Sequence, residues 1–259
     1  MRFGAAMQAA MQATKFEFRF RFLLHGLIYA IGLYAPWNNF LHYDSIRTWQ
    51  FLAAQLNRSG LAGFSGATVG VLVGGIVLAV AGAVVRTWGA AYLGASVVHD
   101  GRLMGDAVVA AGPYRYVRNP LYLGTMLHTL ALCLLMPPTG AVFCVVAMVV
   151  LQLRLIGAEE PFLRVQLGES YVAYCAVVPS LIPALKARIA ASAVRPMWGT
   201  ALVSELYFWG TAISFAALGW RYNAQLVLQG VIVSLGVSMV ARGFLPRRAV
   251  TAETPNETV

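Results

Sequence analysis

Long apolar runs dominate this sequence and restrict its fold more than any motif does. Six runs are candidates for membrane helices: Phe22–Trp37, Gly66–Val85, Leu121–Met136, Gly140–Ile156, Gly199–Trp220 and Ala224–Phe244. A helix needs about 20 residues to cross the hydrocarbon of a bilayer. Lipid offers no partner to unpaired backbone groups, and the runs do not alternate apolar and polar residues as barrel strands do. The sequence therefore predicts an all-α, polytopic membrane bundle with about six spans.

Composition agrees with this class. The chain is 59% hydrophobic and 11% charged, whereas a soluble domain carries about twice that share of charge. Basic loops and anionic lipid headgroups account for the net charge of +9, so no nucleic-acid partner is predicted. The three cysteines have neither disulfide nor zinc spacing, and no metal site is predicted. The expected partners are the bilayer and a hydrophobic or amphipathic small molecule, and the oligomeric state is left open.

The distribution of basic residues predicts the orientation. Arginine and lysine cluster at 15–21, 86–118, 154–195 and 242–248, whereas 38–65 and 221–223 hold only three arginines. The positive-inside rule then places both termini in the cytoplasm, in what we expect to be a bacterial inner membrane. The segments 86–120 and 157–198 fall on the same cytoplasmic side.

The short third and fourth runs are joined by Pro137-Pro138-Thr139-Gly140, which is a turn signal and predicts a short helical hairpin. We divide the chain into N-terminal spans with an interfacial helix (1–85), a central core (86–198) and C-terminal spans with a tail (199–259). The interfacial helix is expected within 38–65, with Asp44 as its N-cap.

Two features are expected at the end of the fourth run. Pro161 lacks a backbone donor and predicts a helix break beside Glu159 and Glu160. The segment Glu160–Val178, which contains Tyr171 and Tyr174, reads as a separate surface helix.

The chemistry is concentrated in two segments. GPYRYVRNPLYLG, Gly112–Gly124, combines two arginines, three tyrosines and two prolines at the start of an apolar run. The acid pair Glu159-Glu160 ends the following run, so the hairpin brings both segments to one membrane face. The arginines suit a carboxylate or phosphate ligand, and the tyrosines suit a stacked base or a cation.

Each of these residues also has a structural interpretation. The prolines can mark the ends of helices, the arginines can bind lipid headgroups, and the tyrosines can be aromatic residues of the membrane interface. The acids form a solvated pair at a helix end, although a carboxylate near the hydrocarbon boundary is costly.

The order GPYRYVRNPLYLG, short hairpin, AEE and LGESYVAYCAVVPSLIP resembles the isoprenylcysteine carboxyl methyltransferases and the related phospholipid N-methyltransferases. The resemblance covers about Arg86–Pro183. It implies that S-adenosyl-L-methionine binds at the cytoplasmic face and that a lipid-like acceptor arrives through the bilayer.

The resemblance also implies a set of residues. By position, the cofactor-binding residues are His99, Asp106, Ala107, Val108, Val109, Tyr114, Asn119, Pro120, Leu121, Tyr122 and Glu159. The family shows glutamine where this chain has His99, and histidine where it has Asn119. Asparagine forms hydrogen bonds but carries no proton at neutral pH.

No catalytic residue is assigned, and Arg154 and Glu160 are candidates for the acceptor side. The leading hypothesis is a membrane methyltransferase that acts on a carboxyl, amine or thiol group. One alternative is an NADPH-dependent reductase of the sterol and steroid type, which has an Arg-x-Pro-x-Tyr core. The other is a non-catalytic scaffold or transporter, although transporters place their polar residues near the midplane.

Overall fold

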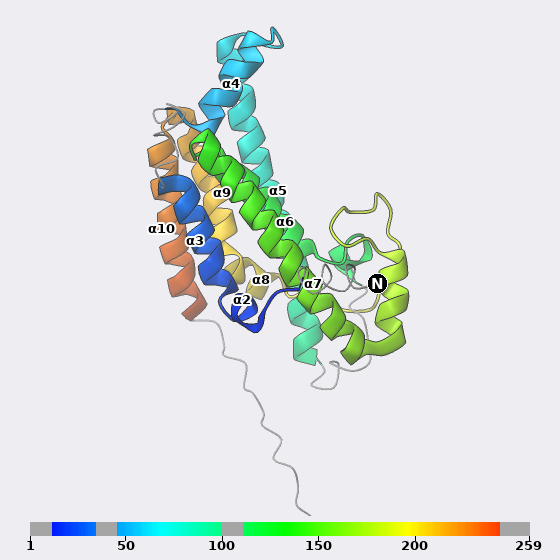
Figure 1. Ribbon diagram of the computed structural model, residues 1–259. Helices are drawn as coiled ribbons and strands as arrows, with labels where there is room; N and C mark the ends of the chain where they lie inside the picture. The colour runs from blue at the N-terminus through cyan, green and yellow to red at the C-terminus, as the bar shows by residue number, and fades with distance from the viewer. Residues whose placement is uncertain (1–11, 35–45, 100–110, 244–259) are drawn as a thin grey trace, which may run out of the picture.

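The computed structural model describes residues 12–34, 46–99 and 111–243, and all regular structure in these ranges is helical (Figure 1). The predicted all-α membrane bundle is confirmed. The elements are α2 (Lys15–Arg19), α3 (Arg21–Tyr34), α4 (Thr48–Arg58), α5 (Phe64–His99), η1 (Gly112–Arg115), α6 (Pro120–Cys133), α7 (Pro138–Val177), α8 (Trp198–Ser204), α9 (Leu206–Leu218), η2 (Gly219–Arg221) and α10 (Ala224–Gly243).

Each predicted apolar run corresponds to a helix or to a bent helix pair. Within the described ranges, α5, α7 and α10 are long and apolar enough to cross a membrane. The pair formed by α8 with α9 and η2 passes the same test together, with a bend of 67°. The first and third runs form α3 and α6, which are shorter apolar helices. The fourth run was also predicted to be short, and this was wrong, because α7 continues past Ile156 to a length of 40 residues. The bundle thus has three or four helices of spanning length, where about six spans were expected.

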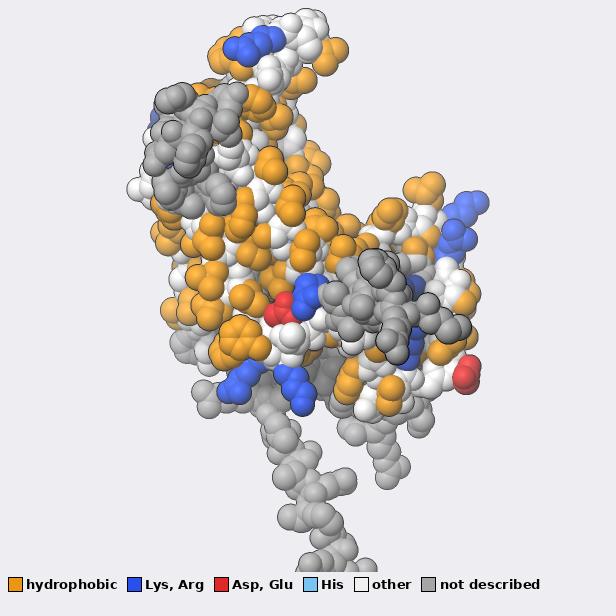
Figure 2. All heavy atoms as spheres, viewed as in Figure 1, with side chains coloured by type: hydrophobic (Ala, Val, Ile, Leu, Met, Phe, Trp, Pro, Cys, Tyr) orange, Lys and Arg blue, Asp and Glu red, His pale blue; other side chains and the backbone are white. Residues whose placement is uncertain are grey.

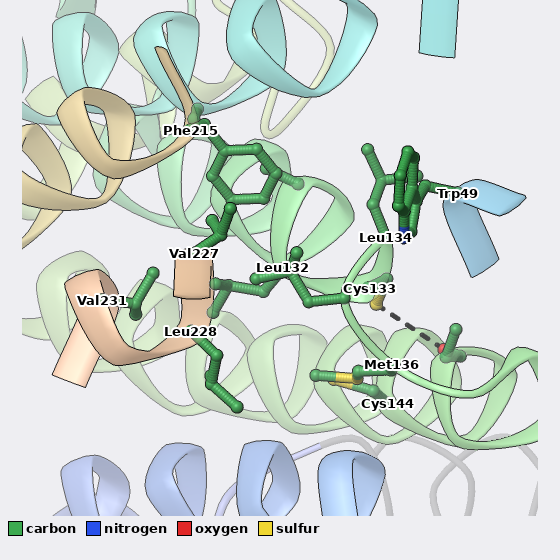
Figure 3. Close-up of a cluster of buried hydrophobic side chains, with 14 of the residues drawn as sticks. Trp49, Leu132, Cys133, Leu134, Met136, Cys144, Phe215, Val227, Leu228 and Val231 are labelled. Atoms are coloured by element: carbon green, nitrogen blue, oxygen red, sulfur yellow. Dashed lines mark hydrogen bonds between the residues drawn. The ribbon is translucent and has the colours of Figure 1, made fainter. Parts of the chain in front are cut away.

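The surface and the core are both apolar, as expected for a protein solvated by lipid. Hydrophobic side chains cover most of the face in Figure 2, and its few charged side chains lie mainly in the lower half. The largest core cluster surrounds the end of α6, where Leu132 and Met136 are buried against Phe215 and Leu228 of α9 and α10 (Figure 3).

Close backbone approach holds α5 against α6. A Cβ added at Gly82 would lie 2.9 Å from the Gly124 carbonyl oxygen, and a Cβ added at Gly124 would lie 2.9 Å from the Gly82 carbonyl oxygen. Small residues allow such contacts between membrane helices. Elsewhere in α5, Gly75 lies against the side chains of Leu134 and Phe215, whereas a Cβ added at Gly70 would meet nothing within 4 Å.

The break in α7 lies at a different residue from the one predicted. The helix continues through Pro161 and has its one non-helical residue at Gly168, with φ 58° and ψ −142°. The prediction of a break at Pro161 was wrong because the loss of one backbone donor inside a packed helix is tolerated. Gly168 adopts a conformation open only to glycine and turns the chain back.

The segment predicted as a surface helix is therefore the last part of α7. Tyr171 and Tyr174 are buried, and with Val178 they form a second apolar cluster that packs against Leu163 and Leu167 before the kink. Most other residues of the segment are exposed, so its predicted surface position holds. The prediction of a separate helix that starts at Glu160 was wrong, because α7 continues to the turn at Gly168.

The predicted interfacial helix is α4, although Asp44 lies outside the described residues. The helix begins at Thr48, and the side chain of Gln50 accepts a 2.8 Å hydrogen bond from the Arg47 backbone N–H. Trp49 is buried, and its backbone N–H donates to Leu134 at the end of α6. This end of the bundle is therefore closed by α4.

Candidate active site

One stripe of α5 supports the first turn of α6. The residues Gly82, Arg86 and Gly89 are spaced by four and three, so they lie on one helix face. Arg86 Nη1 donates to the Leu121 carbonyl at 3.1 Å and to Thr125 Oγ1 at 2.7 Å. A Cβ at Gly89 would lie 3.0 Å from the Leu121 side chain. We call Gly82, Arg86 and Gly89 the α5 platform.

Tyr114 anchors the start of the motif to this platform. It lies in η1, it is buried, and its hydroxyl donates a 3.4 Å hydrogen bond to the Gly89 carbonyl. The Tyr174 hydroxyl in turn donates to the Tyr114 carbonyl at 2.8 Å. Burial raises the pKa of the Tyr114 phenol well above its ordinary range, so this side chain stays neutral.

Glu160 is enclosed by donors from the motif. Arg118 binds both of its carboxylate oxygens, with Nε and Nη2 each at 3.1 Å. Asn119 Nδ2 and Ser180 Oγ each donate to Oε1 at 3.1 Å. The two partner side chains of this ion pair are only 12% and 13% exposed. The charge of Glu160 is therefore balanced within the protein by a bidentate arginine.

Arg118 also closes the end of α7. Its Nη1 donates to the carbonyls of Cys175 at 3.0 Å and Val178 at 2.6 Å. The backbone N–H groups of Arg118 and Asn119 donate to the carbonyls of Pro179 and Ser180. The segment after α7 is thus bound to the motif along its backbone.

Glu159 has different surroundings from its neighbour. Successive residues point about 100° apart around a helix, so Glu159 faces Tyr122 of α6, whose hydroxyl donates to Oε2 at 3.0 Å. Among the described residues no ion pair to Glu159 is found. Together with the Arg118–Glu160 pair, this bond confirms that the motif and the acid pair meet.

Pro120 and Leu121 lie where the motif becomes α6. Pro120 occupies the first turn and is buried, which suits a residue without a backbone donor. Asn119 precedes it with ψ 59° and makes no side-chain cap, because its amide is committed to Glu160 and Ser180. The Leu121 backbone faces Arg86.

Arg154 lies on another face of α7. Five residues separate it from Glu159, which is roughly 140° around the helix. Its Nε and Nη2 each donate at 2.8 Å to Glu17 of α2. The hydrogen bond from Arg154 lowers the pKa of Glu17 to about 2. The acceptor-side roles of Arg154 and Glu160 stay predictions. In the structure, Arg154 is paired with Glu17 and Glu160 is paired with Arg118.

The remaining predicted residues cannot be placed in the same detail. His99 ends α5, but its side chain is outside the described part of the structure, as are Asp106, Ala107, Val108 and Val109. Within the described ranges, no group of three or more His, Cys, Asp or Glu residues could hold a metal ion.

Sequence reasoning missed three residues that build this region. Arg86 binds Leu121 and Thr125 of α6, Ser180 binds Glu160, and Glu205 binds Arg86. The spacing of Gly82, Arg86 and Gly89 was a usable signal, since a charged residue between two glycines at the end of an apolar run predicts a close polar contact. Nothing local distinguishes Ser180 or Glu205.

The comparisons with known proteins agree with this geometry. The model of the phospholipid methyltransferase family matches residues 71–170. The match covers less than half of the chain, and we call residues 71–170 the methyltransferase domain because of this similarity. The domain runs from within α5 to just past the Gly168 turn, and so includes the α5 platform, the motif and both acids. No curated protein and no solved structure matches the chain.

The match confirms the resemblance inferred from the motifs and supports a membrane methyltransferase in general terms. The methyltransferase domain covers less than half of the chain and ends before Ser180. The helices from α8 onward, including Glu205, lie beyond it.

Proposed function

We propose that this chain is an integral membrane methyltransferase that uses S-adenosyl-L-methionine and acts on a lipid-like or small hydrophobic acceptor. The single observation that carries the proposal is the difference between the two acids. Glu160 is paired with Arg118, whereas Glu159 accepts from a neutral hydroxyl. In the part of the chain that the structure describes, Glu159 is thus a carboxylate beside the motif without an ion-pair partner, and such a group favours a cationic ligand.

The residues present fit this cofactor. S-adenosyl-L-methionine carries a sulfonium and an ammonium group, and it supplies a methyl group that transfers by direct displacement. Glu159 would balance its positive charge, and Tyr122 orients that carboxylate. Tyr114, Asn119, Pro120 and Leu121 shape the adjoining turn. The Arg118–Glu160 pair holds this turn in place without adding net charge.

The position of the site supports a hydrophobic acceptor. The motif lies at the start of α6, an apolar helix, and the surrounding bundle exposes apolar side chains such as Val146 and Val150 of α7. A charged cofactor can enter from water and an apolar acceptor from the bilayer. We place this end of the bundle in the cytoplasm, with both termini, from the positive-inside rule.

The electrostatics disfavour the reductase alternative. A phosphate-rich nucleotide needs arginines whose donors are available. Arg118 instead binds Glu160 and two carbonyls, and Arg115 Nε donates to the Ile189 carbonyl at 2.9 Å. The described contacts of Arg115 and Arg118 therefore do not favour a nucleotide-dependent reductase.

Calorimetric titration of the detergent-solubilised protein with S-adenosylhomocysteine tests the proposal. We expect saturable binding, and we expect Glu159→Gln to raise the Kd about tenfold, which corresponds to about 1.4 kcal/mol. Glu169→Gln is the matched control, because it removes one exposed acid from the same helix. The proposal fails if the wild-type protein binds NADPH instead, or if both variants behave alike. Transfer of labelled methyl groups into a membrane lipid extract then identifies the acceptor.

A further inference from the structure

The most highly connected charged group in the described bundle is Arg86, and its main partner comes from outside the methyltransferase domain. Glu205 lies at the bend between α8 and α9 and is 5% exposed. Arg86 Nε and Nη2 donate to its two oxygens at 2.6 and 3.1 Å. The guanidinium also lies 4.1 Å from the centre of the Phe208 ring.

The other side of the same guanidinium binds the first turn of α6. Nη1 donates to both the Leu121 carbonyl and Thr125 Oγ1. Since guanidinium is planar and rigid, fixing one edge fixes the direction of the other. Glu205 and the turn that carries Leu121 are therefore linked through one guanidinium.

The packing leaves Arg86 little freedom to move independently. A Cβ at Gly124 would lie 2.5 Å from Arg86 Cγ, so this glycine makes room for the arginine stem. Two further bonds join the same C-terminal segment to α5: Met197 N–H to the Ala91 carbonyl and Trp209 Nε1 to Thr87 Oγ1, both at 2.9 Å.

We infer that Glu205 is a positioning residue for the cofactor site, and that the helices beyond the methyltransferase domain complete this site through the Glu205–Arg86–α6 connection. The inference rests on the proposed function. Glu205 does not reach the ligand itself; it holds Arg86, and Arg86 holds the turn from which Tyr122 contacts Glu159.

The test compares cofactor affinity with thermal stability in three single variants of the full chain. Glu205→Gln removes the charge from the pair, and Thr125→Val removes the α6 partner of Arg86 without exposing a carboxylate. Thr87→Val is the matched control, because it breaks the neighbouring bond between α5 and α9 and touches no α6 residue that Arg86 binds. All titrations use S-adenosylhomocysteine well below the melting temperature of each variant.

We expect Glu205→Gln to raise the Kd about tenfold and Thr125→Val about threefold, given about 1.4 kcal/mol for each tenfold change. Thr87→Val should lower the melting temperature and leave the Kd unchanged. The double variant Glu205→Gln/Thr125→Val should lose less affinity than the sum of the two, because both act through Arg86.

Two results would overturn the inference while leaving the proposed function intact. One is an unchanged Kd in both Glu205→Gln and Thr125→Val. The other is an equal rise in Kd in Thr87→Val, which would show that general docking of α9 on α5 is what matters. If the wild-type protein fails to bind S-adenosylhomocysteine at all, the proposed function fails, and this inference fails with it.

Discussion

The two ends of the bundle are held together by different interactions. At the end that carries Glu159, bidentate ion pairs and hydrogen bonds join segments far apart in the chain, through Arg118 and Arg86. At the opposite end of α6, an apolar cluster provides the side-chain packing, and a small apolar pocket lies beside Trp49, Phe215 and Tyr222. Hydrogen bonds there join Thr48 and Trp49 to the backbone carbonyls of Met136 and Leu134. A directional network tolerates few substitutions, whereas an apolar core tolerates those that conserve volume.

The largest effect on stability is expected from Glu160→Gln. The change leaves Arg118 largely buried without its counter-charge, and breaking one side of such a pair costs about 4 kcal/mol. Denaturant unfolding in detergent measures the loss, with the exposed Glu169→Gln as control. A loss below about 1 kcal/mol would show that the Arg118–Glu160 ion pair contributes no more to stability than a solvent-exposed ion pair does.

A somewhat smaller loss is expected at the apolar end from Leu132→Ala. Leu132 is 3% exposed within the main core cluster, and truncation of such a leucine costs about 3 kcal/mol. Affinity for S-adenosylhomocysteine should be unchanged in the folded fraction, because no site residue is touched. Leu132→Met, which keeps the volume, should cost less than about 1.5 kcal/mol. A change in affinity would contradict the separation of the two ends.

A gain in stability is expected from Gln152→Leu. The side chain is fully buried in α7, and neither of its polar atoms has a hydrogen-bond partner within the described residues. Replacing an unsatisfied amide with an apolar side chain of similar size should stabilise the fold by about 1 kcal/mol. Gln166→Leu, at an exposed position on the same helix, should be nearly neutral. Destabilisation by Gln152→Leu would reveal a polar partner that this amide needs.

The smallest effect is expected from Glu17 and depends on pH. Its pKa is lowered from 4.5 to about 2 by Arg154, so the folded state favours the carboxylate form. The stability from this pair is therefore fully present above about pH 4.5 and declines as pH falls toward 2. The difference in melting temperature between wild type and Glu17→Gln should shrink between pH 6 and pH 3. A difference that stays constant over this range would remove Glu17 as the titrating group.

Much of the fold could be predicted because apolar runs report directly on membrane helices. The turn between α6 and α7 followed from Pro137–Gly140, although α7 is much longer than predicted. The meeting of the motif with Glu159-Glu160 followed from this turn. The end of each helix was harder to predict. α5 continues 14 residues past the run that ended at Val85, since small and polar residues there remain compatible with a helix once α6 packs against it.

The partners of charged residues were the least predictable part of the site. Sequence treated Glu159 and Glu160 as a pair, and the structure gives them different partners, Tyr122 and Arg118, because adjacent helical residues point about 100° apart. Arg154 was assigned to the acceptor from its distance along the chain, but its helix face turns it toward Glu17. Glu205 and Arg86 are 119 residues apart in the chain and meet through tertiary packing. No local sequence pattern predicts this pair.

The length of α5 has a consequence for the membrane itself. Its 36 residues extend about 54 Å, whereas the hydrocarbon layer is about 30 Å thick. One rigid rod thus runs from the cap formed by α4 to the turn supported by Arg86 and projects into the aqueous phase. A change in lipid chain length is therefore expected to change how much of α5, and of the turn beside Arg86, lies outside the hydrocarbon layer, and detergent removes this variable.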